Sequence, residues 1–301
     1  MSLLEPYVPA GFDDFWAETT AEALSAPLDI SFSPAPDRST SDHLVQELHF
    51  RSISGIQLHG WTAEPLSTGR YPAFLWVPPY SRWSMKPNEY GIRKDFTSLS
   101  FNFFGESSFH DEVYQPSRGY FAEGVATPET WIFRRMFQDS VIAARILEKL
   151  DSVDSNKIGS MGMSQGGGIS IWLAAFVPQI KAVCADMPFL GAIPWVFASA
   201  KHFRYPLKEL TDYMEANVGG KDQVDRTISY FDTMNVATRC TKPVLVTAGL
   251  KDPAVKTEQV VAIYNALQGP KQMDEIDWGH DWHPSMVERN SNWLTSRLAA
   301  K

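Results

Sequence analysis

The residues best suited to do chemistry are a serine between two glycines, Gly162-Met163-Ser164-Gln165-Gly166. A short apolar run precedes this G-x-S-x-G pattern, and a helix-like segment follows it over about 167–176. In a strand–turn–helix context, the pattern indicates a sharp turn that raises a nucleophilic serine above the end of a sheet. The glycines are needed because a Cβ at either position would collide with the neighbouring strand or helix. The alternative is an ordinary glycine-rich turn, since the pattern is short.

A serine hydroxyl needs a base to take its proton, and the base needs an acid to orient it. In the α/β-hydrolase arrangement the chain order is Ser, acid, His, with the last two on loops after late strands. The apolar run 243–248 ends in Gly249-Leu250-Lys251-Asp252, which puts Asp252 at the carboxyl end of a predicted strand. This position favours Asp252 as the acid, although an Asp is also common in a turn before a helix.

The candidate base follows the next predicted strand, 271–276. His280 is favoured over His283, because Gly279 frees the loop before His280, whereas His283 stands before Pro284 at the start of the last predicted helix. The sequence therefore predicts that Ser164, Asp252 and His280 act together.

Two alternatives involve the same loop. Asp281 is a fallback acid, but it adjoins His280 in sequence and points elsewhere in most loop geometries. A metal site made of His280 and His283 with Asp277 or Asp281 has less support, because the spacing suits a helix face and the flanking glycine and proline disfavour a helix. We expect no metal and no cofactor.

The oxyanion that forms during acyl transfer needs two N–H donors. One is the backbone N–H of Gln165, which follows the serine at the start of a helix. The other is expected from the loop after an earlier strand. Pro78 and Pro79 carry no N–H, so Tyr80 is the first residue after the run 71–77 that can donate. If Tyr80 only packs its ring, Ser81 is next.

Strand-like and helix-like segments alternate along the chain, which predicts an α/β-hydrolase three-layer sandwich with a mostly parallel sheet. We expect one domain over 1–301, with an N-terminal helix extension, a loop at 27–42 and a helical insertion at about 189–235 before the acid-bearing strand. The predicted helix starting at Thr127 and Pro128 has capping signals. The predicted strands are 44–50, 56–64, 71–77, one within 96–104, a run before Gly162, 181–187, 243–248 and 271–276; the predicted helices are 11–25, 127–150, 167–176, 206–218, 222–230, 257–267 and 285–299.

Composition indicates an ordinary globular protein: 301 residues are 44% hydrophobic, with a net charge of −8. The acidic balance argues against nucleic acid or an anionic membrane as the main partner. Cys184 and Cys240 are expected in the core. The N-terminus lacks a signal-peptide pattern and no apolar run approaches the ~18 residues of a membrane span, so we expect a cytoplasmic protein.

With these residues placed, the chain resembles the acetyl xylan esterase / cephalosporin C deacetylase family, carbohydrate esterase family 7, nearly from end to end. The matching stretches are 12–19, 27–29, 60–61, 79–80, 133–139, 162–168, 186–190, 229–232, 249–252, 264–265 and 279–280.

This resemblance implies that Ser164, Asp252 and His280 form a catalytic triad and that the Tyr80 and Gln165 backbones form the oxyanion hole. It also implies a metal-independent enzyme that removes acetyl groups from small acetylated sugars, xylo-oligosaccharides and cephalosporin C. Family members are often ring-shaped hexamers, so a homo-oligomer is expected.

One stretch departs from the family pattern. The family carries an Arg-Gly-Gln motif after the strand that follows the oxyanion loop, and here the corresponding residues are Asn102-Phe103-Phe104-Gly105-Glu106-Ser107. Replacing the arginine with phenylalanine removes a charged side chain with five hydrogen-bond donors, which would have held the loop in place. The sequence therefore leaves local geometry, substrate range and assembly open at this point.

The leading hypothesis is a serine esterase that works through an acyl-enzyme. The alternatives are a hydrolase of another small ester or lactone, because the fold accepts many acyl substrates, and a non-catalytic binding member of the fold. Aromatic side chains near the site are candidates to stack on a sugar ring, or else belong to the core or an interface. They are Trp83, Phe189, Trp195, Trp278 and Trp282.

Overall fold

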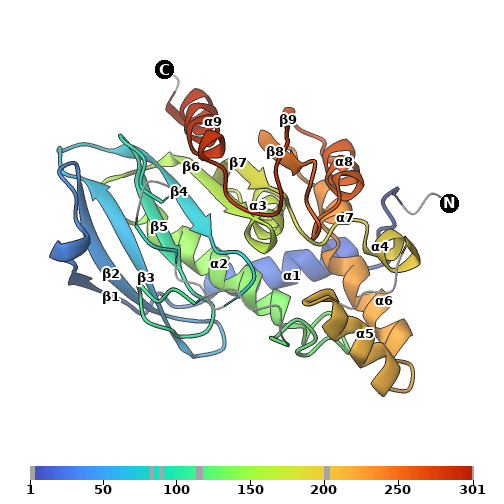
Figure 1. Ribbon diagram of the computed structural model, residues 1–301. Helices are drawn as coiled ribbons and strands as arrows, with labels where there is room; N and C mark the ends of the chain where they lie inside the picture. The colour runs from blue at the N-terminus through green and yellow to red at the C-terminus, as the bar shows by residue number, and fades with distance from the viewer. Residues whose placement is uncertain (1–3, 82–84, 88–90, 113–117, 200–203, 300–301) are drawn as a thin grey trace.

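A single sheet forms the centre of the protein. The computed structural model describes residues 4–81, 85–87, 91–112, 118–199 and 204–299, and these form a nine-stranded sheet in the order β1-β2-β3-β5-β4-β6-β7-β8-β9 (Figure 1). The strands are β1 (Ile30–Pro34), β2 (His43–Arg51), β3 (Gln57–Pro65), β4 (Tyr71–Val77), β5 (Thr97–Phe101), β6 (Val153–Met163), β7 (Ile180–Asp186), β8 (Val244–Gly249) and β9 (Lys271–Ile276).

The sheet is parallel from β5 to β9 and antiparallel from β1 to β5. The apolar runs that predicted strands at 71–77, 181–187 and 243–248 became β4, β7 and β8, which are buried along almost their whole length. Continuous apolar sequence is what a parallel strand needs when helices cover both faces of its sheet. The predicted mostly parallel α/β sandwich is confirmed.

Strand β1 corrects one prediction, because the sequence favoured a loop over 27–42. Residues 30–34 pair with β2 alone and form the edge of the sheet. Their polar, proline-flanked sequence carries a weak strand signal, and the hydrogen bonds to β2 decide the conformation.

Helices cover the two faces of the sheet unequally (Figure 1). A large core lies between the sheet and α1, α2, α3, α7 and α8, and a smaller one lies between the sheet and α9 with its terminal turn. The helices are α1 (Phe12–Ser25), α2 (Ile132–Glu148), α3 (Gln165–Phe176), α4 (Ile193–Ser199), α5 (Leu207–Ala216), α6 (Gly220–Phe231), α7 (Thr233–Ala237), α8 (Thr257–Ala266) and α9 (Pro284–Leu294), with short turns η1 (Pro36–Arg38) and η2 (Thr295–Ala299).

The N-terminal helix extension is confirmed as α1, and it ties the helical insertion to the body. Trp16 is fully buried, stacks on Phe176 at 4.6 Å and meets Phe231 of the insertion edge to face at 5.4 Å. Its indole N–H donates to the carbonyl of Tyr230 at 3.0 Å. Aromatic burial of this extent contributes several kcal/mol, about 3–5 for a Trp lost to alanine.

Helix α2 begins later than the sequence predicted. Residues 127–131 form a turn, because the Thr130 hydroxyl donates to the Gly124 carbonyl at 2.7 Å and the Ile132 N–H donates to the Glu123 carbonyl at 3.0 Å. These contacts with the preceding loop outcompete the local capping signals at Thr127 and Pro128.

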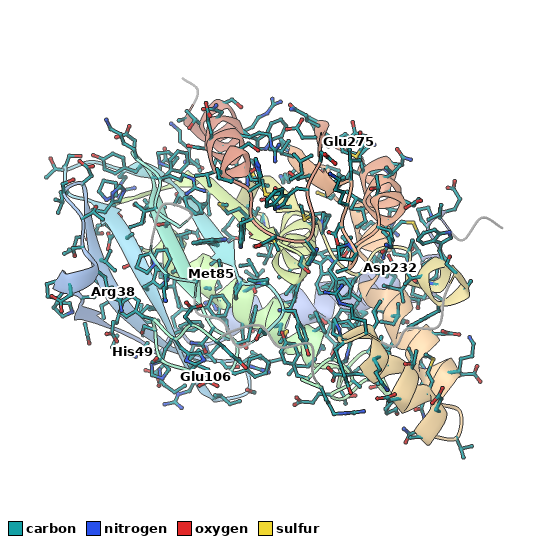
Figure 2. The ribbon with its side chains drawn as sticks, viewed as in Figure 1. Arg38, His49, Met85, Glu106, Asp232 and Glu275 are labelled. Atoms are coloured by element: carbon teal, nitrogen blue, oxygen red, sulfur yellow. The ribbon has the colours of Figure 1, made fainter. Side chains whose placement is uncertain are left out.

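The helical insertion comprises α4 to α7, which confirms the predicted helices at 206–218 and 222–230 as α5 and α6. Asp232 anchors its base (Figure 2). The buried carboxylate accepts hydrogen bonds from the Tyr7 hydroxyl at 2.7 Å and from the N–H groups of Ala192, Ile193 and Met234 at 2.9–3.0 Å. Burial raises the pKa of Asp232 to about 6. The insertion and the N-terminal segment are therefore held at one point.

No helix within the described residues is long and apolar enough to span a membrane.

Candidate active site

Ser164 occupies the sharp turn between β6 and α3, with φ 55° and ψ −118°. A non-glycine residue rarely adopts this conformation, which costs about 1–3 kcal/mol unless the surroundings enforce it. Here the Ser164 N–H donates to the Asp186 carbonyl at 2.8 Å, and the Ser164 carbonyl accepts from the N–H groups of Gly168 and Phe189 at 3.0 and 2.9 Å. The neighbouring strand and helix thus hold the serine in its strained geometry.

The two glycines around Ser164 are required by space, as the sequence predicted. A Cβ on Gly162 would lie 2.5 Å from the Gly166 carbonyl carbon, and one on Gly166 would lie 2.1 Å from the Val77 carbonyl oxygen. Both obstacles are backbone atoms that cannot rotate away. Close contact between the turn and the end of β4 therefore depends on glycine at both positions.

We expect Gly166→Ala to destabilise the fold by about 2–4 kcal/mol, because the added methyl must push the turn away from β4. Urea unfolding measures the loss. Gly279→Ala is a suitable control, since Gly279, like Gly166, is not at positive φ, and an added Cβ there would have only the Lys251 carbonyl oxygen nearby among the described residues, at 4.0 Å. Equal losses in the two variants would show that the general effect of adding a methyl group, rather than the contact with Val77, determines the loss.

Asp252 and His280 are in contact, as predicted from their positions after β8 and β9. The His280 Nδ1 lies 2.6 Å from the Asp252 Oδ2. The other carboxylate oxygen of Asp252 accepts from the N–H groups of Ala254 and Val255 at 2.7 and 2.8 Å, which fixes the carboxylate. Because Nδ1 faces this acceptor, Nε2 is the ring nitrogen left to accept a proton.

The alternatives for these roles have other partners. His283 caps α9, with its Nδ1 2.8 Å from the Ser285 hydroxyl. Asp281 accepts from the Trp282 N–H at 2.8 Å, and Asp277 pairs with Lys251 at 2.7 Å. In the part of the chain that the structure describes, no cluster of three or more His, Cys, Asp or Glu side chains is arranged to hold a metal ion.

Ser164, His280 and Tyr80 line one cavity of about 580 Å³. Phe189 and Trp282 also line it, and Trp282 packs against Trp76 at 5.8 Å between ring centroids. The wall combines apolar and charged groups: Pro79, Asp111, Glu112, Met163, Val196, Arg204, Tyr205, Pro206, Leu207, Pro253, Ala254, Lys256, Gln259 and Asp281.

Two of the five aromatic candidates for sugar stacking, Phe189 and Trp282, therefore face the cavity. Trp195 and Trp278 are not among its described lining residues, and Trp278 is 42% exposed beside His283. Trp83 lies outside the described residues.

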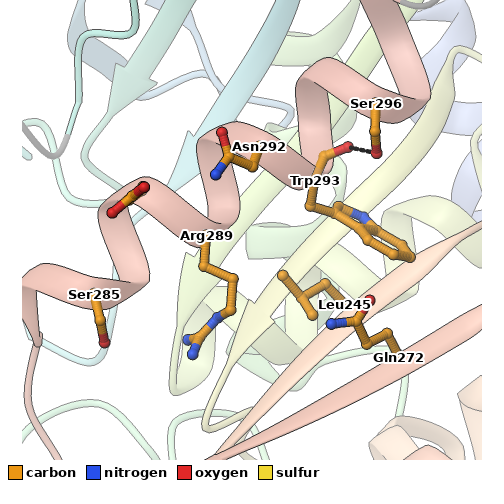
Figure 3. Close-up of a pocket in the computed structure, with 8 residues that line it drawn as sticks. Leu245, Gln272, Ser285, Arg289, Asn292, Trp293 and Ser296 are labelled. Atoms are coloured by element: carbon orange, nitrogen blue, oxygen red, sulfur yellow. Dashed lines mark hydrogen bonds between the residues drawn. The ribbon is translucent and has the colours of Figure 1, made fainter.

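A second hollow, of about 370 Å³, lies between α9 and strands β8 and β9 (Figure 3). Leu245 and Trp293 form its apolar part, and Arg289 donates to the Thr247 hydroxyl at 2.9 Å and pairs with Asp274. The predicted nucleophile and base are not among its described lining residues, whereas both line the larger cavity.

The two residues predicted to supply the oxyanion donors are Gln165, next to Ser164 in the chain, and Tyr80, which lines the same cavity as Ser164. Gln165 is the first residue of α3, so its N–H belongs to the first helical turn, where N–H groups lack a partner within the helix. Tyr80 directly follows the two prolines after β4 and lines the cavity. Ser81, the fallback donor, gives its N–H to the Tyr120 hydroxyl at 3.1 Å. The Ser81 N–H thus already has a hydrogen-bond partner within the protein.

The stretch that departs from the family motif is held by Asn102 and by Arg135 of α2. The Asn102 Oδ1 accepts from the N–H groups of Phe104 and Glu106 at 3.2 and 2.9 Å, and its Nδ2 donates to the Glu106 carbonyl at 2.5 Å. Phe104 packs against Tyr120 with ring centroids 4.6 Å apart. Arg135 Nη1 donates to the Phe103 carbonyl at 2.9 Å, and its guanidinium carbon lies 5.6 Å from the Phe104 ring centroid. A side-chain amide, an arginine and aromatic packing therefore hold this loop.

Two residues near the site have no local sequence signal, Tyr120 and Glu209. Tyr120 lies in a stretch whose sequence has no clear helix or strand pattern. Glu209 is an acidic residue on a short helix, and the sequence around it does not distinguish it from other surface acids. What distinguishes them is their hydrogen bonds to the loop after β4, with partners 39 to 129 positions away along the chain.

The sheet order and the strained serine turn between β6 and α3 define an α/β-hydrolase. Within this class, the acetyl xylan esterase (AXE1) family model matches residues 4–296, and the chain belongs to that family. The resemblance inferred from the sequence is confirmed.

Individual relatives agree with this assignment. The chain is 23% identical over 294 residues to the acetyl esterase Axe7A of Xylanibacter ruminicola, covering 90% of this chain but only 63% of that relative. The structure of acetyl xylan esterase 1 from Thermoanaerobacterium sp. matches with a TM-score of 0.83 and 25% identity, over 97% of this chain and 95% of that one. The acetyl xylan esterase from Paenibacillus sp. R4 shares the fold, with a TM-score of 0.87, 24% identity and 98% coverage of both chains.

Proposed function

We propose that the protein is a serine carboxylesterase that removes acetyl groups from acetylated oligosaccharides, with cephalosporin C as a second substrate. The observation that carries this proposal is a single cavity lined by Ser164, in its strained turn, and by His280. The Nδ1 atom of His280 is hydrogen-bonded to the buried carboxylate of Asp252. Membership in the acetyl xylan esterase family supports the acetyl group as the one removed.

In the proposed mechanism, His280 Nε2 takes the hydroxyl proton of Ser164 as Oγ attacks the acetyl carbonyl carbon. The carbonyl oxygen becomes an oxyanion that accepts hydrogen bonds from the backbone N–H groups of Tyr80 and Gln165. The intermediate collapses, the C–O bond to the sugar breaks, and His280 returns the proton to the leaving alcohol. Water then repeats the sequence on the acetyl-serine and releases acetate.

A second candidate is a hydrolase of another small ester or lactone. The altered stretch 102–107 favours it, because Phe104 packs on Tyr120, and Tyr120 in turn packs on Tyr80 of the cavity wall at 4.8 Å. A change in this wall changes which alcohol fits, whereas the serine chemistry stays the same.

The test is acetate release from acetylated xylo-oligosaccharides and from cephalosporin C, beside a series of p-nitrophenyl esters of increasing acyl length. We expect release from both acetylated substrates and a preference for acetyl over longer acyl groups. Turnover of longer esters or lactones without acetate release from sugars would contradict the deacetylase proposal and support the second candidate. An absence of turnover with every substrate would contradict both.

A further inference from the structure

The Tyr120 hydroxyl joins the two segments that carry the proposed oxyanion donors. It accepts the Ser81 N–H at 3.1 Å and donates to the Gln165 Oε1 at 2.9 Å. Ser81 directly follows Tyr80, and Gln165 directly follows Ser164. Burial raises the pKa of Tyr120 far above its ordinary value, so the hydroxyl keeps its proton and fills both hydrogen-bonding roles at neutral pH.

The ring of Tyr120 makes a second connection. It packs at a tilt against the rings of Tyr80, at 4.8 Å and 35°, and Phe104, at 4.6 Å and 41°. Phe104 stands in the place of the arginine expected from the family motif. Tyr120 thus connects Phe104 with Tyr80 of the loop after β4, and these ring contacts limit the directions in which Tyr80 can move.

Glu209 fixes the same loop from the helical insertion. Its Oε1 accepts the Tyr80 hydroxyl at 3.0 Å and the Gly119 N–H at 2.8 Å, and its Oε2 accepts the Phe121 N–H at 3.0 Å. The side chain is on α5 and is 2% exposed. A Cβ on Gly119 would lie 2.1 Å from the Tyr80 hydroxyl oxygen, so these groups are packed without spare room. Three donors satisfy this buried carboxylate.

We propose that Tyr120 and Glu209 are positioning residues that set the distance and orientation between the two oxyanion donors. The inference rests on the proposed esterase function. The Tyr80 N–H belongs to a loop and the Gln165 N–H to a helix, so their separation depends on contacts between the two segments. An oxyanion hole works when its donors lie about 2.7–3.1 Å from the developing charge, and small displacements weaken transition-state binding more than substrate binding.

Tyr120→Phe tests the inference, because it removes the hydroxyl and keeps the ring that packs against Tyr80 and Phe104. We expect kcat for an acetyl ester to fall about tenfold, less than the 10²–10³-fold loss typical of a deleted oxyanion donor, with KM within about twofold. The dissociation constant of phenylboronic acid, which forms a tetrahedral adduct on a serine, is expected to rise by the same factor as kcat falls. A purely structural role would lower the melting temperature without this matched loss.

The chain offers a matched control in Tyr213→Phe. The Tyr213 hydroxyl also donates to a glutamine Oε1, that of Gln223 at 2.6 Å, but the pair lies between α5 and α6. We expect kcat and boronate affinity of this variant to equal those of the wild type.

Glu209→Gln is a second variant for the case in which Tyr120→Phe does not fold. The amide keeps one acceptor, but its NH₂ group then faces an N–H donor of Gly119 or Phe121, which forces one segment away. We expect a loss in kcat and boronate affinity of about tenfold, with Glu215→Gln on the exposed face of the same helix unchanged.

The outcomes separate the two proposals. If the wild type turns over acetyl esters and Tyr120→Phe or Glu209→Gln retains wild-type kcat and boronate affinity, the positioning role is wrong and the esterase proposal stands. If the wild type shows no Ser164-dependent turnover, both are contradicted.

Discussion

Ser164→Ala is expected to lower kcat for acetate release by about 10⁶-fold, the loss seen when a serine hydrolase loses its nucleophile. No other atom in the turn can form the acyl-enzyme. The residual rate would come from binding and the oxyanion donors alone. Alanine has the same Cβ as serine, so the strained φ of 55° and the three backbone hydrogen bonds that hold the turn are unchanged. Acetate release and the melting temperature, measured on the same preparation, separate chemistry from folding.

The control for this variant is Ser25→Ala, at the exposed end of α1, where the hydroxyl bonds only to the Glu22 carbonyl among the described contacts. We expect its kcat to match that of the wild type. Ser164→Ala with more than about 1% of wild-type kcat would mean that another group attacks the ester, and the assignment of Ser164 would be wrong.

Asp252→Asn is expected to lower kcat by about 10⁴-fold through the wrong histidine tautomer. The Oδ1 side of Asp252 faces the N–H groups of Ala254 and Val255, so the amide oxygen of asparagine takes that side. The NH₂ group then points at the His280 Nδ1 and donates to it. This places the imidazole proton on Nε2, where His280 can no longer accept the proton of Ser164.

The measurement for Asp252→Asn is kcat over a pH range, with Asp277→Asn as the control. Asp277 is an exposed carboxylate on the loop that carries His280, and it pairs with Lys251 at the surface. We expect the control to retain wild-type kcat. Wild-type activity in Asp252→Asn together with inactivity in Asp281→Asn would move the role of the acid to the fallback residue.

The departure at 102–107 concerns the oxyanion loop more than the nucleophile. Asn102, the ring contacts of Tyr120 with Phe104 and Tyr80, and a charge-assisted hydrogen bond from Arg135 to the Phe103 carbonyl hold the segment. Substrate preference at this site is therefore expected to depend on the shape of the wall beside Tyr80.

The sequence by itself determined the parts of the protein whose causes are local. Backbone contact at the serine turn leaves no room for a side chain, so glycines appear two positions either side of Ser164. Strands buried on both faces must be apolar throughout, so β4, β7 and β8 were predicted. Asp252 and His280 were chosen from the chain order Ser, acid, His and from the strand that precedes each residue. In the structure the two side chains are 2.6 Å apart.

The tertiary structure alone decided features whose causes lie far away along the chain. Strand β1 exists because β2 offers it hydrogen bonds, and α2 starts late because the Thr130 hydroxyl bonds to an earlier loop. Tyr120 and Glu209 gain their roles from partners 39 to 129 residues away. A hydrogen bond between distant residues imposes no period or spacing on the sequence around either one, because it is formed only when the whole fold brings them together.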